Sequence, residues 1–214
     1  MPAAEKTAKE LAEFNGDVGN IKPGARFRDR RHLSGTGVHL PLVQGIHSVG
    51  DEVFSVVLCG GYEDDVDNGE EIIYVGQGKG AKTGESARGR PQAGDQEWKG
   101  ANAALRHAYT TRLPIRVIRG DKLNSIYAPN PGGKYRYRYD GLYVVDEWWE
   151  AKGKAGYMMC MFRLKVTKEV QRGRKDGIQM LLAARSLVAF TPIPTLMRNT
   201  QGPLTVPRTN LGAY

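Results

Sequence analysis

The sequence predicts an α+β domain built on a strongly twisted sheet or barrel, with one or two helices packed against it. Two observations support this fold class. Short runs rich in β-branched and aromatic residues alternate with Gly, Asn or Asp turns, which is typical of strands. One longer segment in the middle of the chain instead has apolar residues at helical spacing. The predicted strands cover residues 53–59, 71–75, 114–119, 142–149 and 157–166.

The main predicted helix begins at Asp95, because an aspartate side chain is a good N-cap, and runs to about Thr111. Pro114 helps to end it, since proline cannot continue a helix. The face expected to be buried carries small and large apolar residues at helical spacing, namely Trp98, Ala101, Ala104, Leu105 and Ala108.

The remaining segments have weaker patterns. Residues 4–14 predict a short leading helix, and residues 178–190 have a helical pattern in an otherwise proline-rich tail. Residues 79–94 contain mostly Gly, Lys, Arg and Ser, which predicts a long exposed loop.

Length, charge and cysteine content restrict the class of protein. A chain of 214 residues without a long linker is expected to form one domain. The formal charge is +8 although six acids lie between Glu63 and Glu71, so the rest of the chain is more basic than the net charge suggests. This favours a polyanionic partner over a membrane surface, and no apolar run reaches the length of a membrane span. Cys59 and Cys160 lie in apolar stretches and are expected to be reduced core residues.

The most informative segment joins two predicted strands and reads Gly-Gly-Tyr-Glu-Asp-Asp at residues 60–65. A glycine pair, an aromatic, a carboxylate three residues on and a second aromatic at Tyr74 would form a narrow slot with a hydrogen-bond acceptor at its edge. Such a slot fits a flat heterocycle: a carboxylate accepts from the exocyclic amine of cytosine, and two tyrosine faces enclose the ring.

This segment also has two simpler interpretations. It can be a solvated acidic hairpin turn in which Asn68 and Gly69 supply the positive φ angles. It can also be a calcium loop, but its glycine comes one residue early and the twelfth position is Gly76 rather than glutamate, which excludes that motif.

Several motifs in order resemble the SRA domain (SET and RING associated, also called YDG), over about residues 20–166. They lie at residues 43–47, 59–69, 74–78, 95–96 with Asn102 and Leu105, and 139–143. The resemblance implies a saddle-shaped β-barrel that binds methylated duplex DNA and flips the modified cytosine into a pocket. It also divides the chain into an extension at residues 1–19, the domain at 20–166 and a second extension at 167–214.

Transferred to this sequence, the resemblance makes Tyr62 and Tyr74 the walls that stack on the base, and Asp65 the acceptor for its amine. The backbone of Cys59 and Gly60, beside Gly61, would line the floor and edge, where the absence of a Cβ permits close approach. Val75 stands where relatives usually have threonine, so the pocket is more apolar and its tolerance of hydroxymethylcytosine is open.

The family also has two groove probes. Val43 or Gln44 falls where a thumb enters the gap left by the flipped base. Arg88, in the loop of the family's finger, is our choice for contacting the orphan guanine, because guanidinium pairs bidentately with O6 and N7. The Asn-Lys-Arg finger of the mammalian reader is absent, so strand preference does not transfer.

Basic residues outside the pocket are candidate phosphate contacts, namely Lys79, Lys82, Arg90, Arg136 and Arg138. Residues 135–139 alternate tyrosine and arginine, which on a strand places the two kinds of side chain on opposite faces. A row of tyrosines facing the core, with solvated arginines, is an equally good interpretation.

Other chemistries are less well supported. Asp140 with Glu150 and Lys152 superficially suggests a metal-dependent nuclease, but residues 150–156 have the pattern of a turn. The four histidines lack the cysteine pair of a zinc deaminase. We expect a reader without catalytic residues, metal or cofactor, whose partner is DNA with methylated or hemimethylated CG. Its relatives imply a nuclear location and chromatin-associated partners. The alternative is the DNA-targeting module of a modification-dependent endonuclease.

Overall fold

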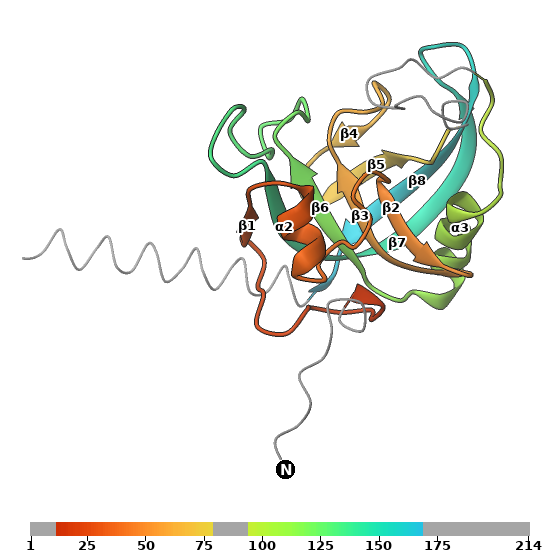
Figure 1. The fold of residues 1–214 in the computed structure, drawn as a ribbon. Helices are drawn as coiled ribbons and strands as arrows, with labels where there is room; N and C mark the ends of the chain where they lie inside the picture. The colour runs from red at the N-terminus through yellow and green to blue at the C-terminus, as the bar shows by residue number, and fades with distance from the viewer. Residues whose placement is uncertain (1–11, 79–93, 169–214) are drawn as a thin grey trace, which may run out of the picture. The chain divides into compact units, whose positions relative to one another are not determined.

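The computed structural model describes residues 12–78 and 94–168. Its helices are α2 (Arg30–Gly35) and α3 (Ala101–Thr111), which cover different parts of one sheet (Figure 1). The strands, in chain order, are β1 (Arg26–Phe27), β2 (Ile46–Val49), β3 (Glu52–Leu58), β4 (Val66–Asp67), β5 (Glu71–Val75), β6 (Ile115–Gly120), β7 (Tyr137–Lys152) and β8 (Met158–Val166). The fold is therefore a mixed α+β arrangement with a large twisted sheet and few helices, as the sequence predicts.

The strands pair in the order β2-β3-β6-β7-β8-β5-β4, and β1 pairs with β7. The β3–β6 pair is parallel and the other pairs are antiparallel. Among the described residues this path is open, with β2 and β4 at its two ends, so the pairing does not show the closed barrel that the resemblance implies.

The longest strand, β7, extends well beyond the predicted residues 142–149 at both ends. Its first half pairs with β6 and its second half with β8, up to the pair Lys152 and Met158. The pattern of residues 150–156 predicts a turn, but the strand continues to Lys152 because its backbone finds a partner in β8. The turn itself is confined to the residues after Lys152.

Helix α3 begins later than the sequence predicts. Its N-cap is Gly100, with a φ of 52°, rather than Asp95. The Asp95 carboxylate accepts a hydrogen bond from the Met158 backbone N–H at 2.8 Å, and the Gln96 N–H donates to the Met158 carbonyl. These contacts tie residues 95–96 to β8, so a tertiary contact replaces the local cap.

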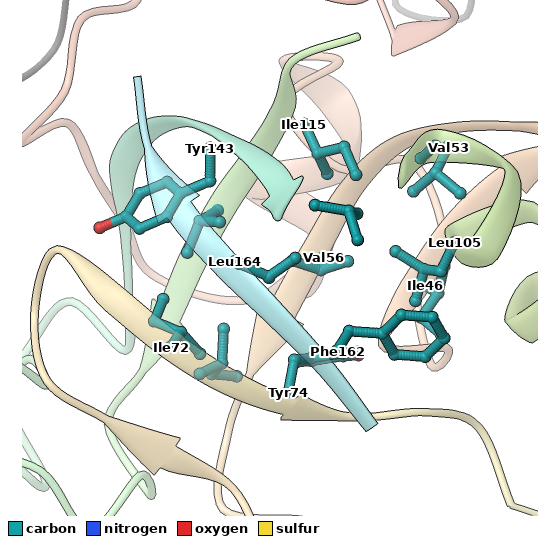
Figure 2. Packing of buried hydrophobic residues seen from close by; sticks show 14 of the residues in the cluster. Ile46, Val53, Val56, Ile72, Tyr74, Leu105, Ile115, Tyr143, Phe162 and Leu164 are labelled. Carbon is teal, nitrogen blue, oxygen red and sulfur yellow. The ribbon is translucent and has the colours of Figure 1, made fainter. Parts of the chain in front are cut away.

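The largest core cluster lies between α3 and the sheet, with Ala104, Leu105 and Ala108 of the helix facing it as predicted. Residues from six strands complete it, and Figure 2 shows Ile46, Val53, Val56, Ile72, Tyr74, Ile115, Tyr143, Phe162 and Leu164 together with Leu105. A second cluster, on the other face of β3 and β6, contains Val57 and Ile118. Both faces of the sheet centre are thus buried.

Two of the three tyrosines in the alternating segment at residues 135–139 follow the core-facing interpretation, whereas Tyr135 is 37% exposed. Tyr137 and Tyr139 are buried in the second cluster, whereas Arg136 and Arg138 lie toward the opposite side. Both cysteines are free, and Cys160 is buried in the main cluster, where burial raises the pKa of its thiol to about 11. None of the helices in the described part of the chain is long and apolar enough to cross a membrane.

A buried arginine attaches the first described residues to the sheet. Arg116, on β6, is fully buried, and its Nε donates to the Val38 carbonyl at 3.0 Å. Its other nitrogens donate to the carbonyls of Ala12, Phe14 and Gly16. Burial lowers the pKa of Arg116 to about 10, so the side chain stays charged at neutral pH and is stabilised by carbonyl dipoles.

Candidate nucleic-acid site

The loop from β3 to β5 carries the predicted base pocket. After Leu58 ends β3, Gly60 takes a φ of 66°, and a Cβ there would lie 2.4 Å from the Lys122 carbonyl oxygen. Only glycine fits this backbone without a shift. At the far end of the loop, Gly69 has a φ of 80°, whereas Asn68 does not adopt a positive φ, so the turn differs from the simple hairpin weighed as an alternative.

Tyr62 is half-buried beside the apolar side chains of Val75, Met159 and Met161. Its hydroxyl oxygen accepts a hydrogen bond from the Gly78 N–H at 2.8 Å. Burial raises the pKa of the phenol, so it stays protonated at neutral pH. The hydrogen bond and the apolar neighbours fix one face of the ring against the end of β5.

Asp65 lies against the same end of β5. Its Oδ1 accepts from the Val75 N–H at 2.9 Å. Among the residues that the structure describes, Oδ2 has no hydrogen-bond or ion-pair partner, and the side chain is half-buried. Burial raises the pKa of Asp65 to about 7, and the nearby acids Asp64 and Asp67 add to that effect. This carboxyl is oriented by one backbone contact and has one oxygen left to accept a ligand donor.

Tyr74 packs in the main core, as Figure 2 shows with Ile72 and Phe162, and its phenol also lies close enough to Asp65 and Tyr62 to interact with both. It is only 4% exposed, and burial, with a smaller contribution from Asp65, raises the pKa of its phenol well above the usual range. A Cβ on Gly45 would lie 3.0 Å from its hydroxyl oxygen, so that hydroxyl contacts the loop before β2.

The other two aspartates of the loop have structural partners. The Asp64 carboxylate accepts from the Lys154 N–H at 3.1 and 3.3 Å, which fastens the pocket loop to the β7–β8 turn. Asp67 receives two hydrogen bonds from Arg119, at 2.6 and 2.8 Å, and one from Ser125 at 2.7 Å. The sequence pattern did not distinguish these two acids from Asp65, because their partners lie far away in the chain.

The thumb candidates lie at the surface, with Val43 66% exposed and Gln44 also exposed. The backbone of Cys59 is on the pocket loop, but its side chain packs against Gly120 in the second cluster. Val75 is buried, and its N–H is the donor to Asp65. The candidates Lys79, Lys82, Arg88 and Arg90 lie outside the described residues.

The remaining phosphate candidates form ion pairs within the chain. Arg136 pairs with Asp121 at 3.2 Å and Arg138 with Asp140 at 2.7 Å. A cavity of about 440 Å³ lies beside the second pair and is lined by Asn68, Gly69, Glu70, Arg119, Tyr127, Arg138 and Asp140. Its walls include none of the three predicted pocket side chains.

The nuclease-like residues do not form a metal site. Asp140 pairs with Arg119 at 3.2 Å, and the Glu150 carboxylate accepts from the Trp98 indole N–H. Ten positions of β7 separate the two acids, which is about 33 Å along a straight strand. Across residues 12–78 and 94–168 there is no cluster of three His, Cys, Asp or Glu side chains that could hold a metal ion.

The twisted sheet and the Gly-Gly-Tyr loop that follows β3 define an SRA-type domain, and the comparisons with known proteins agree. Residues 14–169 match the SAD/SRA domain family, and the chain belongs to that family. A UHRF1-like protein of Cryptococcus neoformans var. grubii is 42% identical over 158 residues, which cover 70% of this chain and 45% of that protein. The chain therefore spans less than half the length of this curated relative.

Two solved structures give the same fold. A modification-dependent TagI restriction endonuclease superposes with a TM-score of 0.64 at 33% identity, over 72% of this chain and 52% of the endonuclease. The SUVH5 SRA domain in complex with fully methylated CG DNA superposes with a TM-score of 0.58 at 34% identity, over 73% of this chain and 95% of that domain. The chain is thus homologous to SRA domains that have been solved with methylated DNA.

Proposed function

We propose that this domain binds duplex DNA containing 5-methylcytosine and flips the modified base into a pocket formed by Tyr62, Asp65 and Tyr74. The observation that carries the proposal is Asp65, which is held by the Val75 N–H through one oxygen and has the other without a partner in the described residues. A half-buried acceptor of this kind matches the exocyclic amine of cytosine. The SRA domain solved with methylated CG DNA supports the same ligand.

The energetics of such a pocket are nearly balanced. Extruding a base costs a few kcal/mol of stacking and pairing. Stacking on an aromatic side chain returns roughly 1–3 kcal/mol per base, and a hydrogen bond to a charged group adds roughly 1.5–3 kcal/mol. Net affinity would therefore come largely from phosphate contacts, and binding should weaken steeply as salt is raised.

Recognition of the methyl group would rest on the apolar side chains beside Tyr62, among them Val75 and Met161. One methyl group in an apolar pocket is worth about 1–3 kcal/mol, or roughly 10–200-fold in affinity. The domain would prefer methylated DNA without rejecting the unmodified duplex completely.

The other predicted contacts belong to the same proposal. Val43 or Gln44 would enter the gap in the helix, and Arg88 would contact the orphan guanine. Phosphates would be bound by Lys79, Lys82, Arg90, Arg136 and Arg138, the last two after exchanging their internal partners. The binding unit would be residues 20–166 folded as a saddle-shaped barrel, within a nuclear protein that meets chromatin-associated partners.

The test is a titration, at stated salt, against matched duplexes whose single CG is unmodified, hemimethylated, fully methylated or hydroxymethylated. We expect a preference of roughly tenfold or more for a modified duplex. Tyr62→Ala and Asp65→Ala should remove that preference, while Asp51→Asn, at an exposed acid in the β2–β3 turn, should keep it. Equal affinity for all four duplexes would leave only a sequence-blind basic DNA binder.

A second candidate is the targeting module of a modification-dependent endonuclease, which the likeness to the TagI enzyme favours. This chain covers 52% of that enzyme, and a plasmid assay tests whether it also carries a cleaving activity. Cleavage of a plasmid with Mg²⁺ that requires cytosine modification would support this candidate. Loss of that cleavage in Glu150→Ala would place the activity in this chain, whereas the absence of cleavage in the parent would leave the reader alone.

A further inference from the structure

The loop before β2 is exposed through its side chains and held through its backbone. Leu42 and Val43 are 49% and 66% exposed, and Gln44 is exposed as well. The carbonyl groups of these three residues point inward, where each accepts at least one hydrogen bond from a buried side chain. We call residues 42–44 the thumb loop.

One arginine contacts all three carbonyls. Arg30, the first residue of α2, is 8% exposed. Its Nε donates to the Leu42 oxygen at 3.3 Å, and its Nη2 donates to the oxygens of Val43, at 3.0 Å, and Gln44. The guanidinium also lies over the Tyr137 ring, 5.8 Å from its centre. A planar guanidinium can hold several acceptors in one fixed arrangement, which a lysine ammonium cannot.

A buried histidine adds a second donor. His39 is fully buried, and burial together with the charge of Arg30 lowers its pKa well below the usual value, so the ring is neutral. A carbonyl oxygen only accepts, so His39 Nε2 carries the hydrogen that it shares with the Gln44 oxygen at 3.0 Å. Nδ1 then accepts from the Ser55 hydroxyl at 2.9 Å.

The thumb loop is continuous with the pocket. The next residue, Gly45, accepts from the Val57 N–H at 2.7 Å and lies against the Tyr74 hydroxyl, where a Cβ would come within 3.0 Å of the oxygen. The backbone that presents Val43 is therefore fixed on one side by Arg30 and on the other by a wall of the proposed base pocket.

We infer that Arg30, supported by His39, is a positioning residue for base flipping: it presets the thumb loop so that Val43 or Gln44 enters the duplex without first being ordered. The inference rests on the proposed function. A rigid loop loses less conformational entropy when it inserts. More of the free energy gained from the inserted side chain is then available to offset the cost of extruding the base. Arg30 would not touch the base itself.

The decisive variant is Arg30→Lys, which keeps the charge, with Arg31→Lys as the control at the exposed neighbouring position of the same helix. We expect Arg30→Lys to lower the affinity for a duplex with one methylated CG about tenfold. The loss should shrink to about twofold or less when the methylated cytosine is mispaired, because an unpaired base costs less to extrude. Arg31→Lys should lower neither affinity.

If Arg30→Lys lowered the affinity equally for paired and mispaired duplexes, Arg30 would have only a general structural role and the inference would be wrong. If the variant lowered neither affinity, Arg30 would have no role in binding and the inference would also be wrong. If Arg30→Lys does not fold, as judged by its thermal transition, the double variant Val43→Gly with Gln44→Gly tests the same step with Arg30 in place. It should show the same rescue by the mispaired base, and the absence of rescue would again overturn the inference. Failure of the proposed function is distinguished by the titration of the parent alone. If the parent does not prefer methylated DNA, the proposed function itself is wrong, whatever the variants do.

Discussion

Asp65 and Asp67 are two residues apart in the same loop, yet their pKa values are shifted in opposite directions. Burial alone would raise the pKa of Asp67, but hydrogen bonds from Arg119 and Ser125 outweigh it and the pKa is lowered. The Asp65 carboxylate has a backbone N–H as its only partner among the described residues, and burial raises its pKa to about 7.

Under the proposed function, the difference separates an acid that stabilises the fold, Asp67, from one that binds a ligand, Asp65. A carboxylate whose charge is matched inside the protein gains nothing from a further donor, whereas an incompletely matched one does. Asp67 joins β4 to β6 through Arg119, while Asp65 Oδ2 has no partner in the described residues and is the acceptor for the base in the function that we propose. The following changes test this contrast.

The largest effect is expected from Asp67→Ala. The side chains of Arg119 and Asp67 are 2% and 1% exposed, so the variant removes the main partner of a buried guanidinium. Breaking a buried ion pair in this way costs about 3–5 kcal/mol of unfolding free energy. Urea denaturation measures the loss, with Asp65→Ala as the control at the other acid. A loss below about 1 kcal/mol would mean that Asp140 compensates fully for the missing partner.

Stability should also depend on pH through Asp65. Its folded-state pKa of about 7 is above the ordinary value of 3.8, so the folded protein keeps this proton after the unfolded chain has lost it. The contribution is therefore fully present below about pH 4 and lost as the pH rises to 7. At about 1.4 kcal/mol per pKa unit the full effect would exceed about 4 kcal/mol, and because solvent screens this half-buried carboxyl the decline is on the order of 2–4 kcal/mol.

The measurement is the unfolding free energy of the parent and of Asp65→Asn between pH 4 and 8. The asparagine side chain does not titrate, so the variant should lack this part of the decline. Between pH 4 and pH 8 the unfolding free energy of the parent should therefore fall more than that of Asp65→Asn. Parallel curves would show that Asp65 titrates normally and would remove the contrast with Asp67.

For DNA affinity, in contrast to stability, replacing Asp65 should have a larger effect than replacing Asp67. Above its pKa of about 7, Asp65 is a charged acceptor whose hydrogen bond is worth about 1.5–3 kcal/mol, so at pH 8 Asp65→Ala should weaken binding to a methylated duplex roughly 10–150-fold. Binding to unmodified DNA, which depends on phosphates, should change little. Fluorescence anisotropy with both duplexes measures the two affinities. An equal decrease on both would indicate that Asp65 acts through the general DNA surface.

The smallest effect is expected from Asp64→Ala. This acid accepts from the Lys154 N–H in an exposed contact, so its loss should cost about 0.5–1.5 kcal/mol of stability. Affinity for methylated DNA should fall by less than in Asp65→Ala, because the loop loosens while the acceptor remains. A larger decrease in affinity than that of Asp65→Ala would assign the acceptor role to Asp64 instead.

Local pattern was a good guide where local structure and packing agree. The strand at residues 71–75 was predicted with its observed ends, and the buried face of α3 was predicted at Ala104, Leu105 and Ala108. The start of α3 was predicted wrongly, because Asp95 is drawn to the Met158 backbone, which no local pattern reveals. The family was identified from ordered motifs, and the comparisons confirm it.

The hydrogen-bond and ion-pair partners of the polar side chains could not be predicted from the sequence. Three neighbouring aspartates look alike in the chain, and only the positions of Lys154 and Arg119 distinguish them. Arg30 lies in a basic segment without periodicity, twelve to fourteen residues before the carbonyls it holds. Contacts of this kind depend on how α2 packs, so they follow from the tertiary structure and not from spacing.

The hydrogen bond between the Val75 N–H and Asp65 Oδ1 has a practical consequence for spectroscopy. An amide proton that contacts a titrating carboxyl shifts in its NMR resonance as the carboxyl ionises. The Val75 amide signal is thus a built-in reporter of the charge on Asp65, at a backbone position that needs no chemical label. Because that charge is the one the base would meet, a single cross-peak can follow the occupancy of the pocket while the rest of the spectrum reports on the fold.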